Sequence, residues 1–303
     1  MDKIIAVVGP TASGKTALSI DLAEHINGEI ISCDSMQIYK KMNIGTAKPT
    51  AEETRGITHH MIDIIEPYDN FSCADYVEAA KKCIDEIHSR NKTPIFCGGT
   101  GLYLDNVLTD NIFSEHTSVT AIREELMLLS PNVLHERLRS VDPDSADAIH
   151  QNNVKRVVRA LEIYYATGKT KTQWDIESRL SADKYDAVII GLDYRNRDTL
   201  YNRIDRRVDI MIADGLVDEV KSLDIDRLIL STAGQAIGYK EVIRYLKNEC
   251  NFDDMVNEIK LNTRHYAKRQ LTWFRRNEKI RWYYAEDFNE DIIKFEEIVN
   301  NLF

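Results

Sequence analysis

The stretch of this chain that most constrains its fold runs from Gly9 to Thr16 and reads Gly-Pro-Thr-Ala-Ser-Gly-Lys-Thr. It matches the phosphate-loop pattern G-x-x-x-x-G-K-[ST] at every fixed position. The apolar run over 3–8 predicts a buried strand before it, and apolar residues at helical spacing from Thr16 predict a helix after it. Strand, glycine loop and helix form the context in which this motif binds phosphate. We therefore expect an α/β fold with a P-loop NTPase-like parallel sheet core.

The loop residues predict the chemistry of the site. Backbone N–H groups of a curled glycine loop, together with the positive end of the following helix, attract anionic phosphate. We expect Lys15 to contact the terminal phosphates and Thr16 to offer its hydroxyl to Mg²⁺. The pattern is typical of ATP- and other nucleotide-binding proteins, but it does not say which molecule carries the phosphates, and a chance match in a turn is the alternative. The predicted diphosphate-binding residues are Gly9, Pro10, Thr11, Ala12, Ser13, Gly14, Lys15 and Thr16.

Composition sets broad limits on the class of protein. The chain has 303 residues, of which 29% are charged and 43% hydrophobic, as in ordinary soluble proteins. No apolar run approaches a membrane span, and no targeting segment precedes the first predicted strand, so we expect a cytoplasmic protein without a membrane partner. The five cysteines form no C-x-x-C pair, which favours buried reduced thiols over disulfides or zinc. The net charge of −10 argues mildly against nucleic acid, although a local basic patch decides that question.

Two further strand ends carry candidate site residues. Asp34 follows a predicted strand over 29–33, where α/β sheets place their ligands, and is either a base, a metal-side carboxylate or a helix N-cap. A predicted strand over 94–97 ends in Gly98–Gly101, a second candidate for phosphate contact, although a plain tight turn is favoured. Adjacent histidines point to different sides of an element, so His59-His60 predicts structural hydrogen bonds more than a metal site.

The second half of the chain is mostly helical. From about 113 to 182 glycine is nearly absent and apolar residues recur at helical spacing, which predicts a helical insert; the α/β core is then 1–112 and 183–303. A strand is predicted over 186–192. One long helix is predicted over 200–223, with Arg203, Arg206 and Arg207 on its polar side.

A basic stretch stands out at 264–282. Seven of its residues are Lys or Arg and only Glu278 is acidic, and Tyr266, Trp273, Phe274 and Trp282 are interleaved with them. Cationic and aromatic side chains at helical spacing suit phosphates and stacked bases. The alternative is a solvated basic helix whose aromatic residues are core anchors; in so acidic a chain we favour nucleic acid.

These features together resemble the tRNA dimethylallyltransferases over essentially the whole chain. Besides the loop, the matching segments are Asp34-Ser35-Met36-Gln37-Ile38-Tyr39, Ile44-Gly45-Thr46-Ala47-Lys48-Pro49, His59-His60-Met61-Ile62-Asp63, Gly98-Gly99-Thr100-Gly101-Leu102-Tyr103 and Lys268-Arg269-Gln270-Leu271-Thr272-Trp273-Phe274-Arg275. So many ordered matches are far more specific than the loop alone.

The resemblance implies transfer of a dimethylallyl group from dimethylallyl diphosphate to N6 of the adenosine 3′-adjacent to the anticodon in tRNA, with release of diphosphate. The loop then holds a leaving diphosphate and not a nucleotide. The implied catalytic residues are Asp34 as base, Thr100 beside the target adenine, and Lys15 and Arg207 on the diphosphate, with Arg203 a close second to Arg207. Mg²⁺ is the implied cofactor. The target base must leave its stack to reach such a site.

The resemblance also implies a surface for the tRNA anticodon stem-loop, which the helical insert would clamp. Its residues are Asp34, Ser35, Met36, Gln37, Thr100, Arg123, Lys155, Arg156, Val157, Val158, Arg159, Gln235, Gly238, Tyr239, Lys240, Lys268, Arg269, Gln270, Thr272, Trp273 and Arg275. Lys240 stands where the family often has arginine, and lysine cannot make a bidentate contact. We expect a monomer. Two alternatives stay open: an ATP-dependent small-molecule kinase, which leaves the basic stretch unexplained, and a non-catalytic tRNA-binding protein switched by nucleotide, which leaves Asp34 and Thr100 without a role.

Overall fold

The chain folds into two compact units, which the computed structural model describes over residues 2–109, 120–180, 184–288 and 298–300. The first unit combines Met1–Leu108 with Tyr185–Phe303, and the second is Thr109–Lys184. The sequence placed the insert at 113–182, so the second unit is slightly larger at both ends. The following paragraphs describe each unit by itself.

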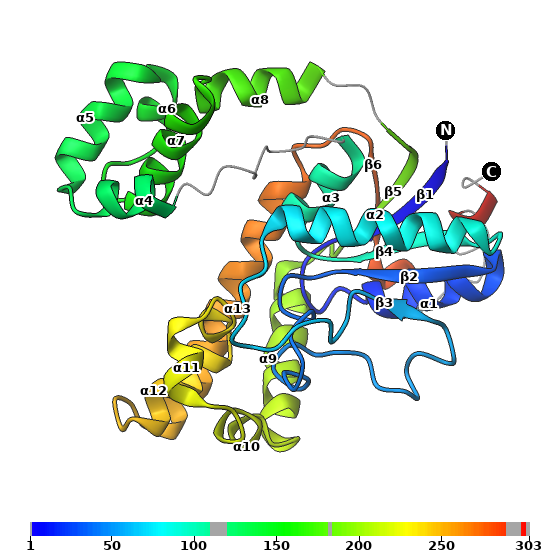
Figure 1. The fold of residues 1–303 in the computed structure, drawn as a ribbon. Helices are drawn as coiled ribbons and strands as arrows, with labels where there is room; N and C mark the ends of the chain where they lie inside the picture. Colours follow the sequence, from blue (N-terminus) through cyan, green and yellow to red (C-terminus); the bar gives the residue numbers. More distant parts are fainter. Residues whose placement is uncertain (1, 110–119, 181–183, 289–297, 301–303) are drawn as a thin grey trace. The chain divides into compact units, whose positions relative to one another are not determined.

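The first unit is built on a parallel sheet of six strands in the order β3-β2-β4-β1-β5-β6 (Figure 1). The strands are β1 Lys3–Val8, β2 Gly28–Cys33, β3 His59–His60, β4 Thr93–Gly98, β5 Asp186–Asp193 and β6 Ile280–Tyr284. The four strands predicted near 3–8, 29–33, 94–97 and 186–192 are confirmed. The short edge strand β3 and the aromatic strand β6 were not predicted.

Helices cover both faces of the sheet, which is why its inner strands are apolar almost throughout. The helices next to the sheet are α1 Lys15–Ile26, α2 Cys73–Ser89 and α3 Gly101–Thr109. Alternate residues of β1 point to opposite faces, so Ile5 and Val7 join the cluster around α1, whereas Ile4 and Ala6 join the cluster around α2 and α3. Both faces of β1 are therefore buried, as expected of a strand that lies between β4 and β5, and the phosphate loop begins at its carboxyl end.

The remaining helices of the first unit are α9 Arg197–Ala213, α10 Leu216–Lys221, α11 Ile225–Leu230, α12 Tyr239–Leu246 and α13 Phe252–Phe274, with short 3₁₀ turns at Ala233–Gln235 and Ala285–Phe288. The prediction of one long helix over 200–223 is wrong. Gly215 adopts a φ of 97°, a left-handed conformation that ends one helix and starts the next. The basic stretch also divides, because α13 ends at Phe274 and Trp282 lies on β6.

The second unit is a helical bundle of α4 Thr120–Met127, α5 Pro131–Val141, α6 Pro143–Ala148, α7 Val154–Thr167 and α8 Lys171–Leu180. Its core is formed by apolar residues of α5 and α7, among them Leu134, Leu138 and Leu161, which are fully buried. The ends of the predicted insert at 113–119 and 181–182 lie outside the described residues.

The structure can be compared with two expectations from composition, the absence of a membrane span and the burial of the cysteines. Among the described residues, no helix is both long and apolar enough to cross a membrane. All five cysteines are reduced, but only Cys33 is fully buried, and the other four are partly exposed. The expectation of buried thiols therefore holds for one cysteine and is wrong for four.

Candidate active site

The phosphate loop lies between β1 and α1, at the carboxyl end of the central strand. Gly14 has a φ of 92°, which an L-residue rarely adopts, and a Cβ on Gly9 would lie 2.4 Å from the Leu192 carbonyl oxygen. The Ser13 hydroxyl is buried and has no hydrogen-bond partner among the residues that the structure describes. A buried hydroxyl without a partner, set inside a loop of backbone N–H groups, suits the oxygen of a bound phosphate.

A pocket of about 740 Å³ opens onto this loop. Its cationic lining comes from Lys15 on the loop, from Arg203, Arg206 and Arg207 on α9, and from Arg55. Arg203 also donates its Nε–H to the Ala12 carbonyl oxygen at 3.1 Å, which ties α9 to the loop. Sequence reasoning missed Asp21 on α1, and Glu53 and Arg55 in a segment without a regular pattern, all of which line the same pocket.

Lys15 is the cation most affected by its surroundings. Its Nζ donates to the Pro10 carbonyl oxygen at 2.6 Å. Burial lowers the pKa of Lys15 to about 8; nearby Cys97 and Asp34 act to raise the pKa and Arg207 to lower it. Burial likewise lowers the pKa of Arg207, against the influence of Asp34 and Glu53. Lys15 and Arg207 therefore both interact with Asp34, and a second anion placed between them would favour their charged forms.

Asp34 and Thr100 meet because their strands are neighbours. Asp34 follows β2 and Thr100 follows β4, and these two strands pair in parallel. Asp34 Oδ1 accepts a hydrogen bond from the Met36 N–H at 2.9 Å, which makes an Asx turn; no helix follows, so the N-cap alternative is wrong. The Ser35 N–H donates to Thr100 Oγ1 at 3.1 Å. The predicted base and the predicted adenine-side residue thus share one end of the sheet with the phosphate loop.

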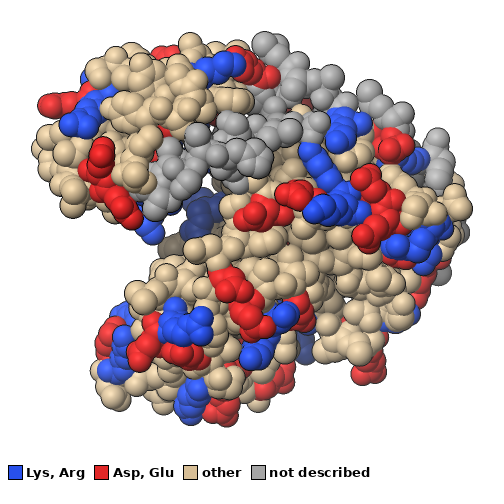
Figure 2. Space-filling view, in the orientation of Figure 1, with Lys and Arg blue, Asp and Glu red and all other residues tan. Residues whose placement is uncertain are grey.

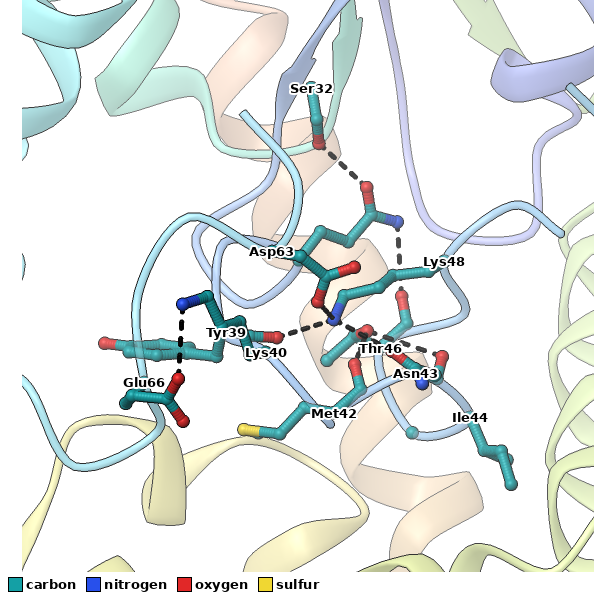
Figure 3. A network of polar contacts seen from close by, with 12 residues as sticks. Ser32, Tyr39, Lys40, Met42, Asn43, Ile44, Thr46, Lys48, Asp63 and Glu66 are labelled. Carbon is teal, nitrogen blue, oxygen red and sulfur yellow. Dashed lines mark hydrogen bonds and ion pairs between the residues drawn. The ribbon is translucent and has the colours of Figure 1, made fainter. Parts of the chain in front are cut away.

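The segment after Asp34 is held by an internal polar network (Figure 3). Gln37 Nε2 donates to the carbonyl oxygens of Thr46 and Ala47, and Gln37 Oε1 accepts from the Ser32 hydroxyl at 2.7 Å. Lys48 Nζ donates to the Tyr39 carbonyl oxygen and forms an ion pair with Asp63 at 2.6 Å. Gln37 was predicted to contact tRNA, but in this structure both ends of its amide hold the protein's own loop.

Glu219 on α10 holds the backbone of the same segment at Asn43–Gly45. Its carboxylate accepts hydrogen bonds from the N–H groups of Asn43, Ile44 and Gly45 and from the Tyr239 hydroxyl. Tyr239 is fully buried, so its predicted contact with tRNA does not extend to its side chain in this structure. Gly238 is also buried, whereas Gln235 is exposed and Lys240 is partly exposed.

The histidine pair makes hydrogen bonds within the protein, as predicted. His59 Nδ1 is bonded to the Ile57 carbonyl oxygen at 2.9 Å, and His60 Nε2 to Glu29 Oε2 at 2.7 Å. Glu29 is buried and is also paired with Arg90 and Lys92. The His60 side chain therefore anchors the edge strand β3 to β2, whereas His59 is bonded within its own segment.

Helix α13 divides the predicted tRNA contacts into two groups. Lys268, Arg269 and Thr272 are exposed, as is Arg275 just after the helix, although Arg275 also pairs with Asp193 at 2.9 Å. The other group points inward. The Gln270 side chain is buried against the phosphate loop, and Trp273 donates its indole N–H to Asp105 Oδ2 at 2.8 Å.

The second unit divides its candidates in the same way. Lys155 and Arg156 on α7 are exposed, and Arg123 and Arg159 both pair with the buried carboxylate of Glu162. Val157 and Val158, which were predicted among the tRNA contacts, lie in the hydrophobic core of this unit. Their side chains pack against other helices and do not reach the surface.

The charged surface is mixed in sign. Figure 2 shows Lys and Arg side chains interspersed with Asp and Glu over the face in view. Within the described residues, no group of three His, Cys, Asp or Glu side chains is arranged to hold a metal ion. Around the phosphate loop, by contrast, the pocket is lined by Lys15 and by four arginines.

A parallel sheet with a phosphate loop at the carboxyl end of its central strand β1, and with the Asp34 carboxylate at the same end of β2, defines a phosphate-loop α/β enzyme core. The family model described as IPP transferase matches residues 37–277. The chain belongs to this family.

Relatives match over nearly the full length. A tRNA dimethylallyltransferase of Caldanaerobacter subterraneus is 45% identical, with 99% of this chain and 96% of the relative covered. One of Anoxybacillus flavithermus is 47% identical, with 99% and 95% covered. Among solved structures, the tRNA isopentenylpyrophosphate transferase of Bacillus halodurans has a TM-score of 0.76 at 42% identity, with 100% of this chain and 97% of that chain covered. A eukaryotic dimethylallyltransferase acting on tRNA has a TM-score of 0.85 at 30% identity, with 99% and 78% covered.

Proposed function

We propose that this chain transfers a dimethylallyl group from dimethylallyl diphosphate to N6 of the adenosine 3′-adjacent to the anticodon in tRNA and releases diphosphate. Family membership and the names of the full-length relatives support a transferase that acts on tRNA. The observation that carries the mechanism is that Lys15 and Arg207 both interact with Asp34, which lies beside Thr100 at the same end of the sheet. In this proposal Lys15 and Arg207 would bind the leaving diphosphate, and Asp34 would accept the proton that adenine N6 loses.

On the donor side, the loop and α9 supply positive charge. The C–O bond of the allylic donor breaks while negative charge builds on the diphosphate. Lys15, Arg207 and the loop N–H groups would stabilise that charge where it develops, which is the most effective place for such groups. Because the pKa of Lys15 is lowered to about 8, the bound diphosphate would also raise it and keep the ammonium protonated during the reaction.

On the acceptor side, adenine N6 is a weak nucleophile because its lone pair is delocalised into the ring. The new bond joins N6 to the dimethylallyl carbon, and one N6 proton must leave. Asp34 would accept that proton as the bond forms, and Thr100 lies beside it to orient the amino group. The electron pair of the broken C–O bond leaves with diphosphate, so no other co-reactant is needed.

Mg²⁺ is proposed as the cofactor of the donor site. Thr16 lines the pocket at the start of α1, and its hydroxyl is the kind of hard oxygen ligand that Mg²⁺ accepts. Magnesium usually binds through substrate phosphates and few protein oxygens, so a single threonine at the loop fits this ion. When bound, the ion would neutralise charge on the leaving diphosphate.

The exposed cations are the proposed contacts of the anticodon stem-loop. Lys268, Arg269 and Arg275 in the first unit and Lys155 and Arg156 in the second are exposed and suited to phosphate contacts. We propose a monomer that acts where tRNA is found, in the cytoplasm. The helical second unit is proposed to clamp the stem-loop.

The test is to incubate the protein with unmodified tRNA, dimethylallyl diphosphate and Mg²⁺, without ATP, and to digest the tRNA for mass spectrometry. We expect one adenosine next to the anticodon to gain one dimethylallyl group. In a separate incubation with ATP, phosphoryl transfer to a small molecule would instead support the kinase alternative. Nucleotide-dependent tRNA binding with no covalent change would support the non-catalytic alternative.

A further inference from the structure

One face of α13 is directed at the active site through three side chains. Tyr266, Gln270 and Trp273 are spaced at i, i+4 and i+7, so they lie on the same side of the helix. Burial and the nearby Asp34 raise the pKa of Tyr266, against the influence of the Thr100 side chain, and Trp273 donates its indole N–H to Asp105 Oδ2 on α3. Gln270 lies between them. The helix whose exposed side carries cations is therefore joined by its other side to the loops that surround the reacting groups.

Gln270 uses both ends of its amide on those loops. Its Oε1 accepts a hydrogen bond from the Thr11 N–H at 2.9 Å, and its Nε2 donates to the Gly99 carbonyl oxygen at 3.1 Å. The side chain is only 5% exposed. A buried amide with both ends bonded has one defined orientation, because any rotation would leave buried polar groups unpaired. Gln270 thus links the phosphate loop to the strand end that carries Thr100.

The glycines after β4 make room for this face of α13. A Cβ on Gly99 would lie 1.8 Å from Gln270 Nε2, and a Cβ on Gly101 would lie 2.1 Å from Trp273 Cδ1. Neither glycine has the left-handed φ that would explain it by backbone conformation. The sequence presented 98–101 as a second candidate for phosphate contact. In the structure, close approach of α13 accounts for Gly99 and Gly101.

We propose that Gln270 is a positioning residue for the transfer reaction, which fixes the phosphate loop relative to the Gly99–Thr100 strand end. The inference rests on the proposed function, because it is this function that requires the donor carbon to meet adenine N6. The Thr11 N–H that Gln270 holds belongs to the loop that would bind diphosphate, and Thr100 directly follows the carbonyl that Gln270 also holds. One side chain therefore sets the spacing between the donor side and the acceptor side.

The expected loss of rate in a Gln270 variant follows from how precisely the donor carbon and adenine N6 must be aligned. Gln270→Met keeps a flexible chain of similar volume but removes both hydrogen bonds. A displacement of about 1 Å at a reacting centre can cost roughly a hundredfold in rate. We expect kcat to fall by about tenfold to a hundredfold, whereas the tRNA affinity should stay within about threefold, since the exposed cations of α13 are unchanged. Substitution of a residue that contacts tRNA would instead lower the tRNA affinity and leave kcat nearly unchanged.

A matched control is available on the same helix. Asn262 Nδ2 donates to Glu241 Oε1 at 2.7 Å, so Asn262→Leu also removes a side-chain amide bond of α13, but one that does not reach the phosphate loop. Gly99→Ala tests the same Gln270 contact from the opposite partner, because the added Cβ would displace Nε2. The three variants separate loss of loop position from general loss of helix stability.

The experiment combines two readouts. Hydrogen–deuterium exchange of the peptide covering 9–16, measured without substrates, should be faster in Gln270→Met and in Gly99→Ala than in wild type or Asn262→Leu. Single-turnover transfer at saturating donor and tRNA should fall in the first two variants and not in the control. Unchanged loop exchange, with a rate loss no larger than that of Asn262→Leu, would overturn the proposal. So would a tenfold loss of tRNA affinity at an unchanged rate. If wild type itself transfers no dimethylallyl group, the proposed function fails, and loop exchange still decides whether Gln270 holds the loop.

Discussion

The backbone N–H of Ser35 donates a hydrogen bond to Thr100 Oγ1 at 3.1 Å. This bond joins the segment after β2 to the segment after β4, two strands that are adjacent in the sheet although the chain places them far apart. Asp34 directly precedes the residue that is bonded to Thr100, and its carboxylate lies within the electrostatic influence of Lys15 and Arg207. The parallel topology thus brings the phosphate loop, Asp34 and Thr100 together at the carboxyl end of the sheet.

Lys15→Ala should weaken diphosphate binding. A hydrogen bond to a charged group contributes about 1.5–3 kcal/mol, so we expect the Kd to rise by roughly tenfold to a hundredfold and turnover to be nearly abolished. Isothermal calorimetry with diphosphate and Mg²⁺ measures this directly. An unchanged Kd in a variant that melts like wild type would remove Lys15 from the donor site.

Diphosphate affinity should depend on pH through Lys15. Burial lowers the pKa of Lys15 to about 8 in the free protein, so the ammonium loses its proton as the pH rises through that value. The bound anion favours the protonated form; binding therefore takes up a proton, and the affinity should decrease as the pH rises above about 8. Lys15→Arg stays charged and is the matched control, since ionisation of the ligand itself affects both proteins equally. Parallel pH profiles for the two proteins would show that Lys15 does not titrate in this range.

The exposed cations of α13 should make tRNA binding dependent on salt. Neutralising one phosphate contact with Lys268→Gln or Arg269→Gln should reduce the slope of log K against log salt by roughly one unit. The control is Lys82→Gln on α2, an equal change of charge at an exposed lysine that pairs with Glu78. Filter binding across a salt series measures the slopes. A slope that changes as much in the control as on α13 would show a general charge effect and no phosphate contact by these residues.

Glu29 should make the stability of the first unit depend on acid pH. Burial acts to raise its pKa, but hydrogen bonds from Arg90, His60 and Lys92 outweigh burial and lower it to about 2. Because the pKa is lower in the folded state, the ionised Glu29 stabilises the fold at pH values above the unfolded pKa of 4.5. This stabilisation is lost as the pH falls toward 2. Glu29→Gln should therefore lower the free energy of unfolding by roughly 1–3 kcal/mol at pH 7. The difference from wild type should shrink as the pH approaches 2 in urea titrations; a constant difference at all pH values would refute the assignment.

The sequence was sufficient for those parts of the site that depend on local pattern. The loop from Gly9 to Thr16 carries its own signature, and the strand before it is a plain apolar run. The position of Asp34 followed from a general property of parallel sheets, that strand ends meet at one edge. The break at Gly215 was missed because apolar spacing continues across it, and only the left-handed φ of the glycine shows that the helix ends.

The inward face of α13 could not be predicted from composition. Gln270 is polar and stands among cations, so it looks like a surface residue until its partners Thr11 and Gly99 are known. Those partners lie far away in the sequence, and no short-range pattern connects them to Gln270. The spacing of Tyr266, Gln270 and Trp273 was a visible signal, but without the fold it could not be distinguished from a face that stacks on bases. Strand β6 was hidden in the same stretch because its aromatic residues resemble a continuation of the basic helix.

The central claim is that Asp34 accepts the proton from adenine N6 during dimethylallyl transfer. Asp34→Asn keeps the size of the side chain but cannot accept the proton, and loss of a general base costs on the order of a hundredfold to ten-thousandfold in rate. The measurement is single-turnover transfer at saturating tRNA and dimethylallyl diphosphate, with wild type and Asp34→Asn side by side and the diphosphate Kd of each as the control for the donor site. We predict a rate at least a hundredfold lower for the variant with a nearly unchanged Kd. A variant that transfers the dimethylallyl group at the wild-type rate would contradict the account and leave Asp34 as the residue of the Asx turn alone.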